Sequence, residues 1–126
     1  AGLSYRADLL IERINDSRDL AYILHHERAL TEQELQAVGA AIARLHDAGV
    51  DHTDLNCRNI LLDSSGTIWL IDFDKCRRRL PGSWQQDNLQ RLLRSFDKEQ
   101  VKLSPFHWQA DSWQNVIKGY LQPKSR

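Results

Sequence analysis

The feature that most constrains the fold is a pair of short apolar segments joined by a four-residue turn. Residues 59–62 (Asn-Ile-Leu-Leu) and 67–71 (Thr-Ile-Trp-Leu-Ile) are rich in branched side chains, which is typical of β-strands. The residues between them, 63–66 (Asp-Ser-Ser-Gly), are strong turn formers. The sequence therefore predicts a β-hairpin with Asn59 at the start of its first strand and Asp72 just past the end of its second.

Three polar residues accompany this hairpin at fixed spacing. Asn59 follows Asp54 by five positions, and Asp72 follows Asn59 by thirteen. Strand pairing brings the two ends of the hairpin together, so an amide oxygen and a carboxylate can share a Mg²⁺ ion, which prefers hard oxygen ligands. A carboxylate at Asp54 can orient a hydroxyl group and accept its proton. The alternative is a surface hairpin with incidental polar residues, and the agreement of motif, spacing and turn favours the functional interpretation.

Size and composition set broad limits. The chain has 126 residues, which is enough for one small domain or for part of a larger one. With 17 acidic residues and 17 Lys plus Arg residues, the formal charge is zero and gives no indication of binding to nucleic acid or membranes. Cys57 and Cys76 are expected to be free thiols in a reducing compartment. The chain starts at Ala1 and contains no methionine, which suggests a fragment or a processed product.

The N-terminal part predicts strands followed by a short helix. Residues 2–5 and 7–14 have the pattern of two short strands. Residues 15–17 (Asn-Asp-Ser) predict a turn that also caps a helix over residues 18–26.

A longer helix leads directly into the loop that carries Asp54. Thr31 and Glu34 have the spacing of a capping box, and Gly49 is placed to end the helix. Gly39 lowers the helix propensity and is expected to mark the close approach of a neighbouring element. Apolar faces within residues 89–96 and 113–120 predict two further helices, so the expected fold class is α+β.

A basic segment follows the hairpin. It contains four cations within five positions and is followed by Pro and Gly, so an exposed loop is predicted. It is either a solvated turn or a site for an anionic substrate, since it lies beside Asp72. The candidate substrate-binding residues are Lys75, Arg77, Arg78 and Arg79.

Taken together, the chain resembles the C-terminal lobe of the protein-kinase-like fold. Within that fold it resembles the 3-deoxy-D-manno-octulosonic acid (Kdo) kinases of Gram-negative bacteria, which are relatives of the lipopolysaccharide core heptose kinases. The resemblance covers most of residues 1–98. It implies a mainly helical lobe with a catalytic β-hairpin over residues 15–126 and remnant N-lobe strands over residues 1–14. It is carried by residues 52–56, 59–63, 69–75, 81–84 and 88–95.

The resemblance also implies roles for individual residues. Asp54 would be the catalytic base, and Asn59 and Asp72 the Mg²⁺ ligands. His52 would be a structural residue that braces the loop.

The expected cofactors are ATP and Mg²⁺, and backbone groups from Glu12 to Ile14 would meet the adenine. The implied reaction transfers the γ-phosphate of ATP to the 4-hydroxyl of Kdo on a lipid A precursor. The enzyme would be cytoplasmic and peripheral to the bacterial inner membrane, with no nucleic acid partner.

Several positions depart from the protein kinase pattern. Thr53 replaces an Arg that often reads a phosphorylated activation loop, and Asp74 replaces a Gly. Asn56 replaces the Lys of serine/threonine kinases, and Arg58 is expected to supply that catalytic cation beside the γ-phosphate. The chain has no Gly-rich phosphate loop and no strand lysine, so we expect it to be inactive alone. A small-molecule phosphotransferase of the aminoglycoside or choline kinase type, and a non-catalytic anion-binding module, are the alternative functions.

Overall fold

The computed structural model describes residues 16–123 as a mixed arrangement of helices and small antiparallel sheets, consistent with the α+β class. The predicted strands at 2–5 and 7–14, and the adenine-contacting residues Glu12 and Ile14, lie outside the described residues. In chain order the elements are β1 (Ser17–Asp19), α3 (Leu20–His26), α4 (Glu32–Asp47), β2 (Val50–Asp51), β3 (Ile60–Asp63), β4 (Ile68–Leu70), β5 (Arg77–Arg78), α5 (Trp84–Lys102) and α6 (Ser112–Tyr120).

The predicted hairpin is confirmed. β3 and β4 pair antiparallel with Ile60 opposite Leu70. The turn is held by the Asp63 carboxylate, which accepts a backbone hydrogen bond from Thr67 and the indole N–H of Trp69, both at 2.9 Å. Burial alone would raise the pKa of Asp63, but these hydrogen bonds and those from Ser65 outweigh it and lower the pKa to about 2.

β3 is the central strand of the sheet because β1 pairs with its other edge. β1 was not predicted: its residues were assigned to a turn and to the start of a helix. Helix α3 begins at Leu20, and its cap is Asp19, whose carboxylate accepts the N–H of Tyr22 at 2.8 Å. The prediction that the cap lies within residues 15–17 is therefore wrong, because the cap lies at least two residues later, at Asp19. All four residues of β3 are buried.

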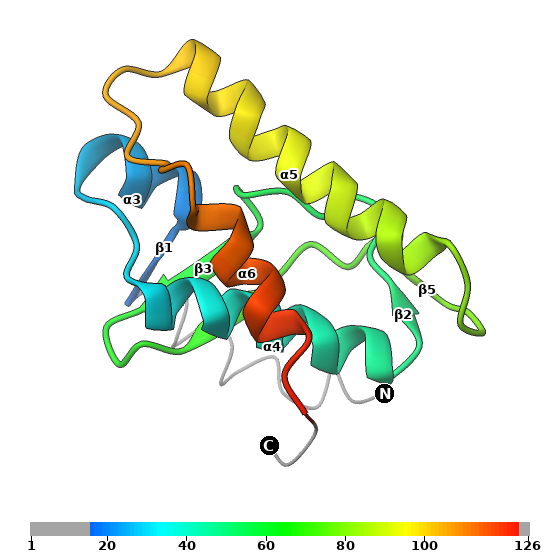
Figure 1. Cartoon of the computed structure of the whole chain (residues 1–126). Coiled ribbons are helices and arrows are strands. Elements are labelled where there is room, and N and C mark those ends of the chain that lie inside the picture. The colour runs from blue at the N-terminus through cyan, green and yellow to red at the C-terminus, as the bar shows by residue number, and fades with distance from the viewer. Residues whose placement is uncertain (1–15, 124–126) are drawn as a thin grey trace.

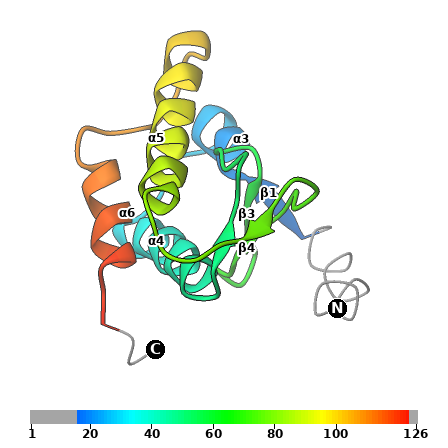
Figure 2. The same ribbon diagram turned by 90° about the vertical axis from the view of Figure 1, so that its right-hand side faces the viewer.

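Helices α4 and α6 pack in close contact, and Figure 2 shows α4 between α6 and the sheet. The capping box of Thr31 and Glu34 is confirmed. Gly49 follows the helix with φ +76°, as expected for a glycine that ends a helix. Gly39 marks the predicted close approach, since a Cβ there would lie 1.9 Å from the carbonyl oxygen of Val116 on α6.

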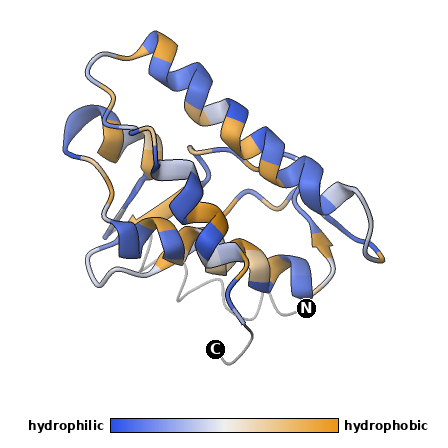
Figure 3. Cartoon of the chain, viewed as in Figure 1, coloured by the Kyte–Doolittle hydropathy of each residue, from blue (hydrophilic) through white to orange (hydrophobic). Residues whose placement is uncertain are grey.

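One apolar core joins the sheet to the helices. Along α5, apolar and polar segments alternate in Figure 3 because the helix buries one face only. Phe96 of α5 stacks on Trp108 with ring centroids 3.9 Å apart. No helix among residues 16–123 is long and apolar enough to cross a membrane. The largest fully buried apolar side chains are Phe96, Leu20, Ile23, Leu24, Ile42, Leu55, Ile60 and Leu92.

Candidate active site

The structure brings Asp54 and Asp72 to one cleft of about 320 Å³. Asp54 comes from the loop between β2 and β3, and Asp72 from the segment after β4. Thr53, Asp74 and Lys75 complete the lining. Three carboxylates and one ammonium group therefore face the same space, and this charge balance favours a bound cation.

Asn59 fixes the backbone of the loop that carries Asp54. It is only 5% exposed, and its Nδ2 donates to the main-chain carbonyl of Asp54 at 2.7 Å. Its Oδ1 accepts the backbone N–H of Asn56 at 3.0 Å. The Asn56 side chain donates to the same Asp54 carbonyl at 2.9 Å. Two side-chain amides thus hold one carbonyl, and the Asn59 oxygen keeps a second lone pair.

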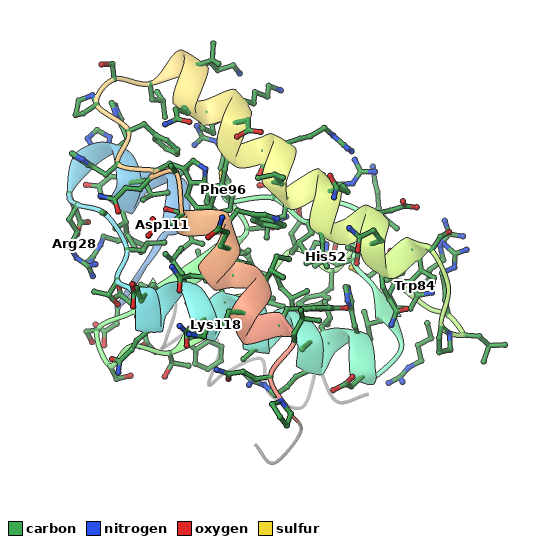
Figure 4. The ribbon with its side chains drawn as sticks, viewed as in Figure 1. Arg28, His52, Trp84, Phe96, Asp111 and Lys118 are labelled. Atoms are coloured by element: carbon green, nitrogen blue, oxygen red, sulfur yellow. The ribbon has the colours of Figure 1, made fainter. Side chains whose placement is uncertain are left out.

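His52 connects this loop to the segment that follows the hairpin. Its ring is completely buried, and Nε2 lies 2.9 Å from the carbonyl oxygen of Ile71. Its Nδ1 lies 3.4 Å from the backbone nitrogen of Asp54 and accepts that N–H. The ring therefore donates through Nε2, and Phe73 packs on it at 5.2 Å between centroids. In the view of Figure 4, His52 lies below α5, and Trp84 marks the start of that helix.

Asp72 has a backbone conformation that is rare for a residue other than glycine. Its φ is +70°, and the residue before it donates its N–H to the carbonyl of Asn59 at 3.0 Å. That bond extends the β3–β4 pairing and sets Asn59 beside the chain just before Asp72. Aspartate tolerates the left-handed region better than most residues, and such conformations concentrate at functional sites.

The donor atoms fit Mg²⁺. The Asp72 carboxylate and the Asn59 amide offer hard oxygens, and Mg²⁺ sites in phosphate-transferring enzymes use one or two carboxylates together with substrate phosphates. Among residues 16–123, no group of three or more His, Cys, Asp or Glu side chains is arranged to hold a metal. Asn59 is buried behind the cleft and is not among the residues that line it, so an ion there would first meet the Asp72 carboxylate and the phosphates of a nucleotide.

A buried polar network behind the cleft was not predicted. Asn88 of α5 lies at its centre, and its Oδ1 accepts the backbone N–H of His52 at 3.1 Å. Because that oxygen is an acceptor, His46 Nε2, 3.0 Å away, must be the donor. The Asn88 amide donates to Asp51 at 2.8 Å. Burial lowers the pKa of His46, although the Asn88 bond and nearby carboxylates oppose this.

The sequence does contain a signal for this network. Trp84, Asn88, Leu92 and Phe96 recur every four residues on α5, and all four are buried. A polar residue within an apolar helical stripe needs hydrogen-bond partners. The partners themselves lie on other elements, so this spacing indicates that they exist but not which residues they are.

The predicted cations separate into different environments. Arg58 does not line the cleft of Asp54 and Asp72; its guanidinium pairs with Glu99 of α5, with Nη2 2.6 Å from Oε2. A placement of Arg58 beside the γ-phosphate, as the sequence predicted, would require this pair to open. Lys75, in contrast, does line the cleft.

The basic segment is exposed, as predicted, but part of it is a strand rather than a loop. β5 pairs with β2, with Arg77 opposite Asp51. Arg79 forms an ion pair with the nearly buried Asp51 carboxylate at 3.0 Å. Arg78 donates to the carbonyl of Ala48 at the end of α4 at 3.1 Å. Two of the four candidate substrate cations, Arg78 and Arg79, therefore have structural partners.

Comparison with known proteins gives a consistent match. The family model described as "Lipopolysaccharide kinase (Kdo/WaaP) family" matches residues 1–120. A 3-deoxy-D-manno-octulosonic acid kinase of Vibrio parahaemolyticus is 54% identical over 108 residues, which cover 86% of this chain and 44% of the relative. Relatives with the same name from Vibrio vulnificus and Photobacterium damsela are 50% and 54% identical over 94% and 90% of this chain. The chain spans about half the length of these relatives. It belongs to the lipopolysaccharide kinase (Kdo/WaaP) family.

Proposed function

We propose that a protein containing this chain is a kinase that transfers the γ-phosphate of ATP to the 4-hydroxyl of Kdo in a Kdo-lipid A precursor. The observation that carries the proposal is the common cleft of Asp54 and Asp72, with Asn59 bonded to the backbone of Asp54. The names of the relatives support Kdo as the acceptor in preference to an aminoglycoside or choline.

The residues divide the work of phosphoryl transfer. Asp54 orients the acceptor hydroxyl and accepts its proton, since it lies on the exposed side of the loop. Asp72 and Asn59 are the residues that would hold Mg²⁺, and the ion would supply positive charge to stabilise the transferring phosphate. His52 and Asn88 keep the loop in place through main-chain contacts. The backbone near residues 12–14 would meet the adenine.

The acceptor is a lipid, so we propose that the enzyme works at the cytoplasmic face of the inner membrane as a peripheral protein. Lys75 and Arg77 are the cations of the basic segment best placed to meet an anionic surface or acceptor. Both are exposed, and neither of the two side chains forms a hydrogen bond or ion pair within residues 16–123, although the backbone carbonyl of Lys75 accepts the Thr53 hydroxyl at 3.2 Å.

The test measures transfer of labelled phosphate from ATP to purified Kdo-lipid by the gene product that contains this chain. Asp54→Asn should lower turnover by roughly 10²–10⁴, the range for a positioned acid–base group, with nucleotide binding nearly constant. Asp72→Asn should raise the Mg²⁺ concentration needed for half-maximal rate. Asp97→Asn, an identical change at an exposed position of α5, is the control and should retain full turnover.

Two outcomes would contradict the proposal. Near-normal turnover of Asp54→Asn would remove Asp54 as the base. A product in which phosphorus couples to a proton other than H-4 of Kdo in NMR spectra would contradict the assigned hydroxyl.

A further inference from the structure

A second cavity adjoins the cleft on the side of α5. It has a volume of about 370 Å³, and we refer to it as the α5 groove. Asp54 is the residue that lines both spaces, so a molecule in the α5 groove reaches the same carboxylate from another direction than a molecule in the cleft. The loop contributes Asp54, Asn56 and Arg58 to the groove, and α5 contributes Ser95, Lys98 and Lys102.

The walls of the α5 groove are held together before any ligand binds. The backbone N–H of Cys57 donates to Ser95 Oγ at 3.0 Å, and the Ser95 hydroxyl donates to the carbonyl of Leu92 at 2.7 Å. Arg58 also links the loop to α5, because it forms an ion pair with Glu99, a side chain that is only 9% exposed. Sites built on fixed elements lose less entropy when a ligand binds.

The electrostatic balance of the α5 groove favours an anion. Arg58 and Glu99 largely neutralise each other. Lys98 and Lys102 are one helical turn apart and exposed, and neither has a hydrogen-bonding or ion-pairing side-chain partner within the described part of the chain. Two ammonium groups therefore face the groove, against the single carboxylate of Asp54.

We propose that the α5 groove binds the anionic part of the acceptor, a carboxylate- or phosphate-bearing sugar, and presents its hydroxyl to Asp54. Lys98 and Lys102 contact the anion, while Arg58 stays paired with Glu99. The inference rests on the proposed kinase function and adds to it a site for the acceptor, distinct from the basic segment of residues 75–79. The nucleotide and the acceptor then approach Asp54 from the cleft and from the groove, respectively.

The competing explanation is that these lysines only solubilise an exposed helix. The same helix offers a matched control, because Arg91 and Arg94 are also exposed cations but do not line the groove. Lys98→Gln/Lys102→Gln and Arg91→Gln/Arg94→Gln each remove two charges from α5. Glutamine has nearly the helix propensity of lysine and arginine, so both double variants should fold normally.

The experiment compares acceptor kinetics of the two double variants in the gene product that contains this chain. Exposed ion pairs contribute about 0.2–1 kcal/mol each, so the lysine variant should raise the KM for Kdo-lipid about 2- to 30-fold. The KM for ATP and the kcat should stay unchanged, and the salt dependence of the acceptor KM should become weaker. The arginine variant should behave like the wild type.

Two further experiments identify which anionic group of the acceptor binds in the α5 groove. If a dephosphorylated Kdo-lipid abolishes the difference between the lysine variant and the wild type, the groove binds phosphate; if the difference persists, it binds the Kdo carboxylate. Titration of the wild type and both variants with free Kdo and with inorganic phosphate, followed by NMR, measures binding without turnover. Binding of either probe that weakens in the lysine variant alone supports the groove even where no transfer is detected.

The failures are distinguishable. A wild type that phosphorylates no Kdo-lipid contradicts the proposed function, whereas an active wild type with an unchanged acceptor KM in the lysine variant overturns the α5 groove. An equal rise in the arginine control also overturns it, because the effect would then be one of general charge.

Discussion

Replacement of Asn88 by leucine should destabilise the protein far more than an ordinary polar-to-apolar change on a helix. Leucine has the same branched shape and the same number of side-chain heavy atoms, so the site stays filled while three hydrogen bonds of 2.8–3.1 Å are lost. The substitution leaves the His52 N–H, the His46 Nε2–H and one oxygen of Asp51 without the hydrogen bond that Asn88 provides. Each buried group left unsatisfied costs about 1–3 kcal/mol. Because Asp51 retains its ion pair with Arg79, we take the lower end of that range and expect a loss of about 3 kcal/mol.

The assay is urea unfolding followed by tryptophan fluorescence. Trp84 contacts the His46 ring edge-on at 5.2 Å, so its emission reports on this part of the core. The control is Gln90→Leu on the exposed face of the same helix, which should change stability by less than about 0.5 kcal/mol. A loss below about 1 kcal/mol for Asn88→Leu would refute the reasoning, since the network would then contribute no more than a single surface contact.

The same network predicts a pH dependence. Burial holds the pKa of His46 below its usual value, so the folded protein binds a proton less readily there than the unfolded chain does. Stability should therefore be complete above about pH 6.5 and decrease as the pH falls below that value. In Asn88→Leu the bond that partly offsets burial is gone, and the decrease should be steeper. Unfolding curves at pH 5 and pH 7.5 provide the measurement.

Three other substitutions have definite expected outcomes. Asp63→Ala should lose about 2.5 kcal/mol at neutral pH, because that free energy corresponds to a pKa of about 2 against the ordinary value of 3.8. The difference from the wild type should shrink as the pH falls below about 4 and vanish as it falls through 2, and a constant difference would contradict this origin. Gly39→Ala should destabilise the protein by about 1–3 kcal/mol in thermal unfolding, because the new methyl group would overlap the Val116 carbonyl. This loss should exceed the gain from the better helix propensity of alanine. An increase in melting temperature would show that α4 and α6 can move apart at no cost. Arg79→Gln should cost about 1 kcal/mol of unfolding free energy and Arg77→Gln almost nothing, since Arg79 alone forms the ion pair, and equal losses in urea titrations would remove that distinction.

The parts of the fold that follow from local chemistry could be predicted from the sequence. The turn at 63–66 and the capping box at Thr31 depend on residues a few positions apart, and both form as expected. The same holds for Gly49, whose positive φ is a local requirement of the helix end. Strand β1 could not be predicted, because three residues are too few to show the alternating pattern of a strand. Its extended conformation comes from pairing with β3.

At the candidate site, the spacing of Asp54 and Asp72 predicted residues that the structure places in one cleft. The ion pair of Arg58 could not be predicted from the sequence, because its partner Glu99 lies 41 residues further along the chain. Asn88 was missed for the same reason: its partners come from the end of α4, from β2 and from the loop that follows. Long-range polar pairing depends on how elements pack, and a single sequence records only that a buried polar group needs a partner.

The position of Asn59 would couple the proposed metal site to the proposed base. The Asn59 side chain uses its nitrogen to hold the backbone carbonyl of Asp54, and under the proposed function its oxygen would be a ligand of Mg²⁺. Asn59→Asp would keep an oxygen ligand but would place a carboxylate oxygen against the Asp54 carbonyl, and Asn59→Ala would release that carbonyl altogether. A double-mutant cycle between positions 54 and 59 should therefore give strongly non-additive rates, with the second substitution costing much less than the first. Ion affinity and proton transfer would then vary together in any variant of position 59.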